Sequence, residues 1–294
     1  MAVKAKTGTS DTLKVEKEDR LLAFLLGSMP GKSRTTVKSY LSHNQVAVNG
    51  CITTRFDLPL VAGDTVTVTY GRSPVTLRHP MLRIIFEDDF LIVVEKRNGL
   101  LSIATDKQTR KTAFNILSDY VKSKDPESLV FVLHRLDRET SGLMMFAKDQ
   151  ALKHRIQADW EGTVVERKYY AVIEGQLERD EGVISTYLTE SKALKVYAAR
   201  KGEGKIAHTA FRVLRRSTEH TLLELELATG RKNQIRAHME YIGQSIIGDK
   251  KYGARTNPLG RVALHAGALS FIHPVTGERH DFTTPVPRVF LDLF

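Results

Sequence analysis

Glycine and proline gather near residue 75 and divide the chain into two segments of different character. Gly71, Ser73 and Pro74 stand close together, and Pro80 follows them. Proline lacks the N–H that helices and sheets need, and glycine favours turns, so such a cluster usually ends regular structure. We therefore expect four parts: a disordered leader at residues 1–17, a small module at 18–72, a linker at 73–82 and a larger domain at 83–294.

The chain is basic, and the excess charge is concentrated in the first segment. Its 294 residues include 44 Lys and Arg against 34 Asp and Glu, a net charge of +10. Residues 1–80 hold 11 basic and 6 acidic residues, which leaves 33 and 28 for residues 81–294, so each segment carries +5. Basic side chains displace the counterions of phosphates, which favours a nucleic-acid partner. Ordinary solubility charge is an equal alternative from these numbers alone.

Several classes of protein are disfavoured by what the sequence lacks. No apolar run reaches the roughly 20 residues of a membrane-spanning helix, and the first residues are polar, unlike a signal peptide. The single cysteine, Cys51, excludes an internal disulfide, argues against zinc and fits a reducing cytoplasm. Neither G-x-x-x-x-G-K-[ST] nor G-x-G-x-x-G occurs. We expect a cytoplasmic protein with no cofactor, no metal, no membrane association and no obligate protein partner.

Residues 18–72 have the pattern of a compact module with two helices and a small sheet. Leu21, Leu22, Leu25 and Leu26 recur at helical spacing. The predicted elements are helices at residues 21–26 and 37–41, a strand at 46–50 that enters a turn, a turn at 61–64 and a strand at 65–69.

This module resembles the S-four RNA-binding domain, which is named after a small-subunit ribosomal protein. The resemblance covers residues 18–70 and rests on Ser33-Arg34, Val46-x-Val48-Asn49-Gly50 and Gly63-Asp64. In that fold a basic helical face meets RNA, which implies phosphate contacts for Lys32, Arg34 and Lys38. The alternative for each of the three is a solvated helix face.

Residues 83–294 mix strand-like and helical patterns. The runs that predict strands are 82–86, 91–94, 130–133, 143–147, 168–173, 209–214 and 221–227. Leu152, Ile156 and Trp160 predict a helix with one buried face, and residues 235–242 predict another. Because the strands follow no regular strand–helix–strand rhythm, we expect an α+β domain with a mixed, mainly antiparallel sheet.

A polar segment between two apolar strands is the most informative part of this domain. Residues 134–142 read His-Arg-Leu-Asp-Arg-Glu-Thr-Ser-Gly. Loops that rigid strands hold in place commonly carry binding or catalytic residues. The pattern by itself also fits an exposed hairpin loop with salt bridges.

Residues 134–143 resemble the signature loop of the Rlu-type (RluA-like) RNA pseudouridine synthases. In that family the aspartate of the loop is the catalytic nucleophile, and the arginine two residues before it helps to displace the target base. The resemblance implies these roles for Asp137 and Arg135. His134 is then either an acid–base group or a hydrogen-bonded residue that holds the loop.

Three further motifs match the family in the same order along the chain. Residues 167–175, Arg-Lys-Tyr-Tyr-Ala-Val-Ile-Glu-Gly, resemble a strand whose tyrosine packs on the target base, which implies that role for Tyr169. Residues 229–238 resemble a motif whose second arginine pairs with the catalytic aspartate, which implies Arg236; Arg231 in the same motif is expected to bind RNA. The segments 248–253, 264–266 and 273–274 complete a resemblance that runs from about residue 96 to residue 287.

Two positions depart from the family pattern. The family usually has Lys-Pro-x-Gly where this chain has Lys96-Arg97-Asn98-Gly99, which implies an altered loop rather than altered chemistry. Asn233 stands where histidine is common, and we assign it no catalytic role from the sequence, although an amide retains the capacity to donate a hydrogen bond.

The implied reaction breaks the glycosidic bond of uridine and rejoins the uracil through its carbon 5. An ionised Asp137 suits attack on the sugar, attack on the base or assistance to elimination, and the sequence leaves all three open. A guanidinium beside a carboxylate favours its ionised form and fixes its orientation. The Tyr169 ring offers a flat surface for the base, which must first leave its stack.

The two resemblances together imply an enzyme that isomerises specific uridines in large-subunit ribosomal RNA, with transfer RNA as the alternative substrate. Two other classes compete. A glycoside hydrolase would use Asp137 and Glu139 as its pair of carboxylates, but it leaves the basic module and the other motifs unexplained. A non-catalytic RNA-binding protein would need the basic module alone, and it predicts that Asp137→Ala leaves function intact.

Overall fold

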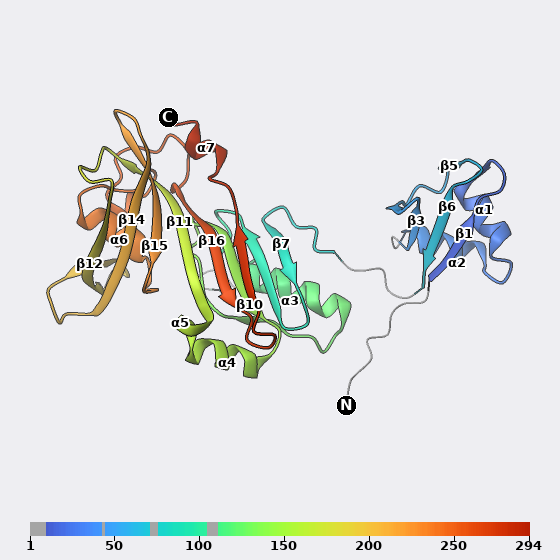
Figure 1. The fold of residues 1–294 in the computed structure, drawn as a ribbon, viewed down its shortest axis with the longest axis horizontal. Coiled ribbons are helices and arrows are strands. Elements are labelled where there is room, and N and C mark those ends of the chain that lie inside the picture. Colours follow the sequence, from blue (N-terminus) through green and yellow to red (C-terminus); the bar gives the residue numbers. More distant parts are fainter. Residues whose placement is uncertain (1–9, 43–44, 71–75, 105–110) are drawn as a thin grey trace. The chain divides into compact units, whose positions relative to one another are not determined.

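The computed structural model describes residues 10–42, 45–70, 76–104 and 111–294. The chain forms two compact units, Met1–Thr76 and Leu77–Phe294, and each has a hydrophobic core of its own (Figure 1). Among the described residues, no helix combines the length and apolarity that crossing a membrane requires.

The first unit packs two helices against a small antiparallel sheet. Its elements are β1 (Ser10–Lys14), β2 (Asp19–Arg20), α1 (Leu21–Ser28), α2 (Arg34–Ser42), β3 (Val46–Val48), β4 (Cys51–Ile52), β5 (Pro59–Leu60) and β6 (Thr65–Thr69). The main sheet has the order β1-β6-β3-β4. The two predicted helices and the strand at 65–69 are confirmed. The strand predicted at 46–50 ends at Val48, because Asn49 and Gly50 both take positive φ angles and turn the chain into β4.

The expected leader at residues 1–17 is wrong for its second half. Ser10–Lys14 form β1, which pairs along its whole length with β6, and Val15 is buried in the core of the first unit. The side chains of this strand are mostly polar and exposed. Its backbone nevertheless forms hydrogen bonds with the edge of β6. The polarity of its side chains does not reveal this long-range pairing. Residues 1–9 lie outside the described residues.

The second unit is built on one large sheet. Its strands are β7 (Leu82–Glu87), β8 (Leu91–Lys96), β9 (Phe131–Val132), β10 (Ser141–Ala147), β11 (Val164–Glu174), β12 (Glu181–Glu190), β13 (Val196–Ala199), β14 (Lys205–Arg216), β15 (His220–Leu227), β16 (Leu264–Ile272) and β17 (Arg279–Thr283). Its helices are α3 (Ala113–Lys124), α4 (Gln150–Ala158), α5 (Trp160–Thr163), α6 (Gln234–Tyr241) and α7 (Arg288–Leu291), with a short 3-10 helix at Lys250–Tyr252.

The sheet has eleven strands in the order β13-β12-β14-β15-β11-β16-β10-β8-β7, with β17 beside β16 and β9 beside β10. Of the strand pairs that the structure describes, only β10 with β16 is parallel. The predicted α+β class with a mixed, mainly antiparallel sheet is therefore confirmed. Every residue of β10 is buried, which explains why its sequence is apolar from Leu143 to Ala147.

Some elements differ from the sequence expectation. The predicted helix through Trp160 is broken, because Asp159 ends α4 and its side chain caps α5 by accepting a hydrogen bond from the Gly162 N–H. The strand predicted at 130–133 shortens to β9. Helix α3 and strands β12, β13, β16 and β17 were not predicted, although β12 pairs with the neighbouring β13 and β16 with the neighbouring β17.

Candidate active site

The polar segment at 134–140 connects β9 to β10 and forms a loop at one end of these two strands. Asp137 lies at a turn in which its carbonyl oxygen accepts a hydrogen bond from the Thr140 N–H at 3.1 Å. The Asp137 side chain is 30% exposed. An aspartate that is neither fully buried nor free in solvent can meet a substrate while the loop holds it in place.

A buried lysine holds this loop through hydrogen bonds to its backbone carbonyl oxygens. Lys96 is fully buried at the end of β8, and its Nζ donates to the carbonyl oxygens of Leu100 at 2.8 Å and Thr140 at 2.6 Å, with longer contacts to Arg97 and Arg138. Burial lowers its pKa to about 7. The carbonyl oxygens around Nζ exceed the two protons that a neutral amine donates, so the contacts favour the ammonium form. Lys96 thus ties the altered 96–99 loop to the C-terminal half of the polar loop.

Two more side chains fix the loop. The buried Ser102 hydroxyl donates to the Leu136 carbonyl at 2.7 Å and accepts from the Leu136 N–H at 3.1 Å. His134 Nε2 accepts from the Met145 N–H at 3.0 Å, and its ring packs against Trp160. Burial lowers the pKa of His134 to about 3, so the ring is neutral near pH 7. Of the two alternatives for His134, an acid–base group or a residue that holds the loop, these contacts favour the second.

Arg236 lies on α6 and contacts two carboxylates. It donates from Nε and Nη2 to Asp249 at 2.6 and 2.7 Å, a bidentate pair, and from Nη1 to Asp137 Oδ2 at 3.3 Å. Burial works against its charge, but the contact with Asp249 outweighs burial and raises the pKa of Arg236. The guanidinium is therefore a permanent cation beside Asp137, and Asp249 is its closer partner.

Tyr169 lies on β11 and is 8% exposed. The pairing of β11 with β16 shifts register between Lys168 and Tyr169, an irregularity of the kind that redirects a side chain. Burial raises the pKa of the Tyr169 hydroxyl, which keeps it protonated near pH 7. A neutral ring beside the polar loop provides a surface on which a base can stack.

These side chains meet at one small hollow of about 60 Å³. Asp137, Tyr169 and Arg236 line it together with Arg135 and Arg231. Ligand pockets commonly measure roughly 300–1,000 Å³, so a nucleoside fits only if the rim moves. Arg135 and Arg231 are exposed, and Arg231 Nε donates to the Ile206 carbonyl oxygen at 3.1 Å.

The remaining predicted RNA contacts, Lys32, Arg34 and Lys38, belong to the first unit. All three are exposed, and Arg34 and Lys38 lie on α2. Val37 and Leu41 on the same helix are buried, so α2 presents a basic face to solvent and an apolar face to the core.

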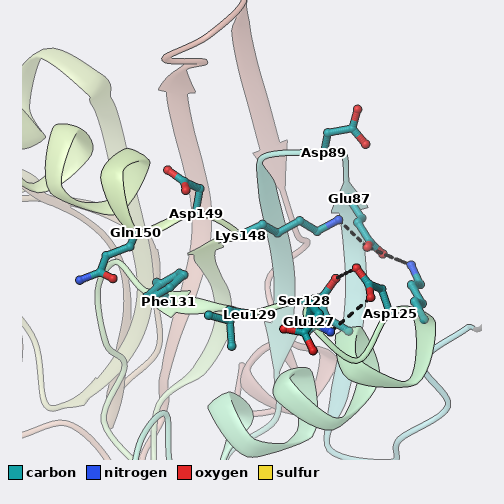
Figure 2. Close-up of a pocket in the computed structure, with 12 residues that line it drawn as sticks. Glu87, Asp89, Asp125, Glu127, Ser128, Leu129, Phe131, Lys148, Asp149 and Gln150 are labelled. Carbon is teal, nitrogen blue, oxygen red and sulfur yellow. Dashed lines mark hydrogen bonds and ion pairs between the residues drawn. The ribbon is translucent and has the colours of Figure 1, made fainter. Parts of the chain in front are cut away.

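A larger groove of about 480 Å³ lies elsewhere, between the β7–β8 turn and the end of α3 (Figure 2). Its lining residues include five acids, Glu87, Asp89, Asp125, Glu127 and Asp149. Lys124 and Lys148 also line it, and Glu87 accepts a hydrogen bond from each. Figure 2 shows Lys148 directed at Glu87. An acidic groove repels phosphates, so its size does not make it a site for RNA.

Sequence reasoning missed several residues that shape the site. Asp249 and Tyr252 belong to the matched segment at 248–253, but their partners were not evident. Lys96 and Ser102 precede the polar loop by more than thirty residues. The nearest signal was the lysine of the altered 96–99 loop, a charged residue at the end of an apolar strand. Among the described residues, no three His, Cys, Asp or Glu side chains gather as a metal site.

Comparison with known proteins identifies the family. The profile of the RNA pseudouridylate synthase family matches residues 90–241, a segment that holds Asp137, Tyr169, Arg231 and Arg236. The chain belongs to this family and is an RNA pseudouridine synthase.

Relatives of this pseudouridine synthase align over nearly its whole length. It is 35% identical to a protein of Bacillus subtilis, named uncharacterized RNA pseudouridine synthase YlyB, over 95% of this chain and 94% of that protein. It is 32% identical to the ribosomal large subunit pseudouridine synthase D of Vibrio cholerae, over 89% of this chain and 86% of that protein.

A solved structure shares the fold. Human RNA pseudouridylate synthase domain containing 4 superposes with a TM-score of 0.58 at 24% identity, covering 71% of this chain and 90% of that one. At this level of identity the likeness concerns the fold alone.

Proposed function

We propose that this pseudouridine synthase isomerises specific uridines of large-subunit ribosomal RNA with Asp137 as the nucleophile. One observation carries the proposal: the partly exposed Asp137 carboxylate lies 3.3 Å from the Arg236 guanidinium, in a hollow that Tyr169 also lines. Attack requires an ionised and accessible carboxylate, and a fixed cation at this distance favours ionisation.

The reaction is an isomerisation with no net change in atoms. The bond between N1 of uracil and C1′ of ribose breaks, the uracil turns, and a bond forms between its C5 and C1′; C5 loses its proton and N1 gains one. Asp137 acts by attack on the sugar, by attack on the base or by assisting elimination, and the three routes give the same product. In each route Tyr169 supports the ring of the base and Arg236 stays charged.

The target uridine must leave its stack to reach Asp137. Flipping a base costs a few kcal/mol, less in a loop or at a mismatch. Arg135 and Arg231 are exposed and line the hollow. We propose that Arg135 enters the vacated space and that Arg231 binds a neighbouring phosphate.

The choice of ribosomal RNA rests on relatives. Proteins named for the large ribosomal subunit, from Vibrio cholerae and from Nitrosomonas europaea, are 32% and 31% identical to this chain. Transfer RNA is the alternative substrate. The chain's single cysteine and its RNA substrate support a cytoplasmic location.

Substitution of Asp137 tests the proposal. We expect Asp137→Asn to abolish pseudouridine formation, by at least about 10³-fold, because an amide is no nucleophile, while RNA affinity stays within a few-fold of the wild type. Pseudouridines are mapped in total RNA from cells that carry the wild-type gene, a deletion or the variant. Glu139→Gln is the matched control in the same loop, and cells that carry it should retain every pseudouridine that the wild type forms.

Three outcomes contradict parts of the proposal. If deletion removes no pseudouridine, or if Asp137→Asn restores the lost sites, the catalytic claim fails. If the lost sites lie in transfer RNA, the choice of substrate fails while the nucleophile stands. Release of free uracil without reattachment would favour the glycoside-hydrolase class instead.

A further inference from the structure

Asn233 has a backbone conformation that few residues adopt. It stands at the N-terminal end of α6 with φ 51° and ψ 24°, in the left-handed region. Asparagine at this position ordinarily caps the helix by accepting a hydrogen bond from the first turn. Within the described part of the chain Asn233 makes no such bond. A strained backbone with an unused capping group indicates that the side chain is held for another purpose.

The amide of Asn233 is directed at Asp137. With its nitrogen towards the carboxylate, Nδ2 donates to Asp137 Oδ1 at 2.9 Å and to Oδ2 at 2.6 Å. The opposite orientation sets the amide oxygen against two carboxylate oxygens and gains one 3.4 Å bond from Arg236. Because an ionised carboxylate accepts and never donates, the site favours the first orientation.

Tyr252 holds that orientation. The Asn233 amide oxygen accepts from the Tyr252 hydroxyl at 3.1 Å, and this hydroxyl accepts from the Val196 N–H at 3.3 Å. The Tyr252 side chain is fully buried, with its ring centroid 4.7 Å from Cζ of Arg236. Burial raises the pKa of Tyr252, so its hydroxyl keeps the proton that it donates.

We propose that Asn233 and Tyr252 form a positioning pair for Asp137, in which Tyr252 orients the Asn233 amide and the amide fixes both carboxylate oxygens. This inference rests on the function proposed above. Arg236 reaches Asp137 with one nitrogen at 3.3 Å and is bound more closely by Asp249. The amide bonds to Asp137 are shorter, so Asn233 rather than Arg236 sets the direction in which the carboxylate faces the hollow.

The identity of the residue at 233 fits this role. The position needs a side chain that tolerates positive φ and offers an N–H, and asparagine and histidine are both enriched at positive φ. Histidine, common at this position in the resembling family, also carries an N–H. Asparagine in place of histidine at position 233 therefore still supplies a hydrogen-bond donor to Asp137.

Two variants at position 233 test the pair. Asn233→Gly keeps the left-handed backbone without strain and deletes the amide, whereas Asn233→His keeps a donor. We expect Asn233→Gly to lower the single-turnover rate at saturating enzyme by about 10- to 100-fold, the value of a hydrogen bond to a charged group. The half-saturating enzyme concentration should stay within a few-fold, and Asn233→His should recover most of the rate. The substrate is a transcript that the wild type modifies.

Tyr252→Phe supplies an independent measurement, because it removes the hydroxyl alone. We expect a rate loss of about 2- to 10-fold, and no further loss when Tyr252→Phe is added to Asn233→Gly. Additive losses, Asn233→Gly with the wild-type rate, or Asn233→His no faster than Asn233→Gly would each overturn the proposal. Thermal unfolding of each variant identifies any rate loss that comes from unfolding.

Failure of the pair is distinguishable from failure of the proposed function. A wild-type chain that modifies no RNA, or Asp137→Asn with full activity, contradicts the function. An active wild type, an inactive Asp137→Asn and a fully active Asn233→Gly contradict the positioning pair alone.

Discussion

At the scale of single residues, Arg236 serves two carboxylates that make different demands on it. Asp249 has a side chain only 1% exposed and binds the guanidinium in a bidentate pair, so each ion compensates the burial of the other. Asp137 is 30% exposed and makes one longer contact. The first pair therefore concerns stability, and the second concerns the charge environment of the candidate nucleophile.

This division predicts opposite consequences for two similar substitutions. Asp249→Asn should lower the free energy of unfolding by about 3–5 kcal/mol, because it removes the closer, bidentate counter-charge of the buried Arg236 cation. Asp137→Asn should change stability by less than about 1 kcal/mol and abolish activity. Urea unfolding of both variants measures the difference. Equal stability of the two would contradict the assignment of Asp249 as the structural partner.

At the scale of elements, the polar loop is placed by the point where β10 meets β16. Gly142 follows the loop with φ 115°, and a Cβ built there would lie 2.2 Å from the Ala266 carbonyl oxygen. The two backbones thus approach more closely than any side chain allows. Arg261 adds a contact at the same junction by donating to the Ser141 hydroxyl at 2.8 Å.

The close approach predicts a severe effect of one methyl group. Gly142→Ala should destabilise the second unit by about 2–5 kcal/mol, combining the cost of positive φ with that of overpacking. Gly243→Ala is the matched control, since Gly243 has φ 75° but no atom within 4 Å of its Cβ position. Its cost should be about 1–2 kcal/mol. Thermal unfolding compares the two variants. Similar melting temperatures would show that the backbones of β10 and β16 move apart to accommodate the added methyl group.

At the scale of the whole molecule, charge is distributed unevenly over the second unit and between the units. The groove beside α3 is acidic, whereas arginines line the hollow at Asp137. In the first unit α2 presents exposed basic residues. The basic face of α2 and the arginines at the hollow attract phosphates, whereas the acidic groove beside α3 repels them.

Reversing the charge of Lys32, Arg34 and Lys38 tests the RNA role that the S-four resemblance implies. The triple Glu variant should bind RNA more weakly, and the slope of log affinity against log salt should fall by roughly 0.7–0.9 for each phosphate that the variant no longer neutralises. Filter binding over a range of salt measures this slope. Lys122→Glu, on α3 of the second unit, is the control. An unchanged slope would remove these residues from the RNA interface.

Neutral histidines of the second unit predict how the stability of that unit depends on pH. Burial lowers the pKa of His134 to about 3 and those of His238 and His265 to about 4. The unfolded chain takes up these protons near pH 6.5 and the folded chain does not, so stability is full above 6.5 and falls as pH decreases from 6.5 towards 4. Urea midpoints between pH 7.5 and 5 measure the slope, which His265→Gln should reduce. A flat profile would contradict the neutral state of these rings.

The sequence alone was sufficient to predict the features that depend on neighbouring residues, namely strands, turns and motifs. The apolar runs predicted most central strands, Asn49 and Gly50 marked a turn, and the polar loop and its companion motifs led to the family that the comparisons establish. Such signals are local, because a strand, a turn or a motif is written in consecutive residues.

Only the tertiary structure decided which of these residues touch. Asp137 and Arg236 lie 99 positions apart, and Lys96 reaches the Thr140 carbonyl across 44. Asp249, not Asp137, is the closer partner of Arg236, and Asn233 turns its amide away from its own helix. These contacts depend on how distant strands pair and how α6 packs on the sheet, and the distances that result are set by three-dimensional packing, which no run of neighbouring residues encodes.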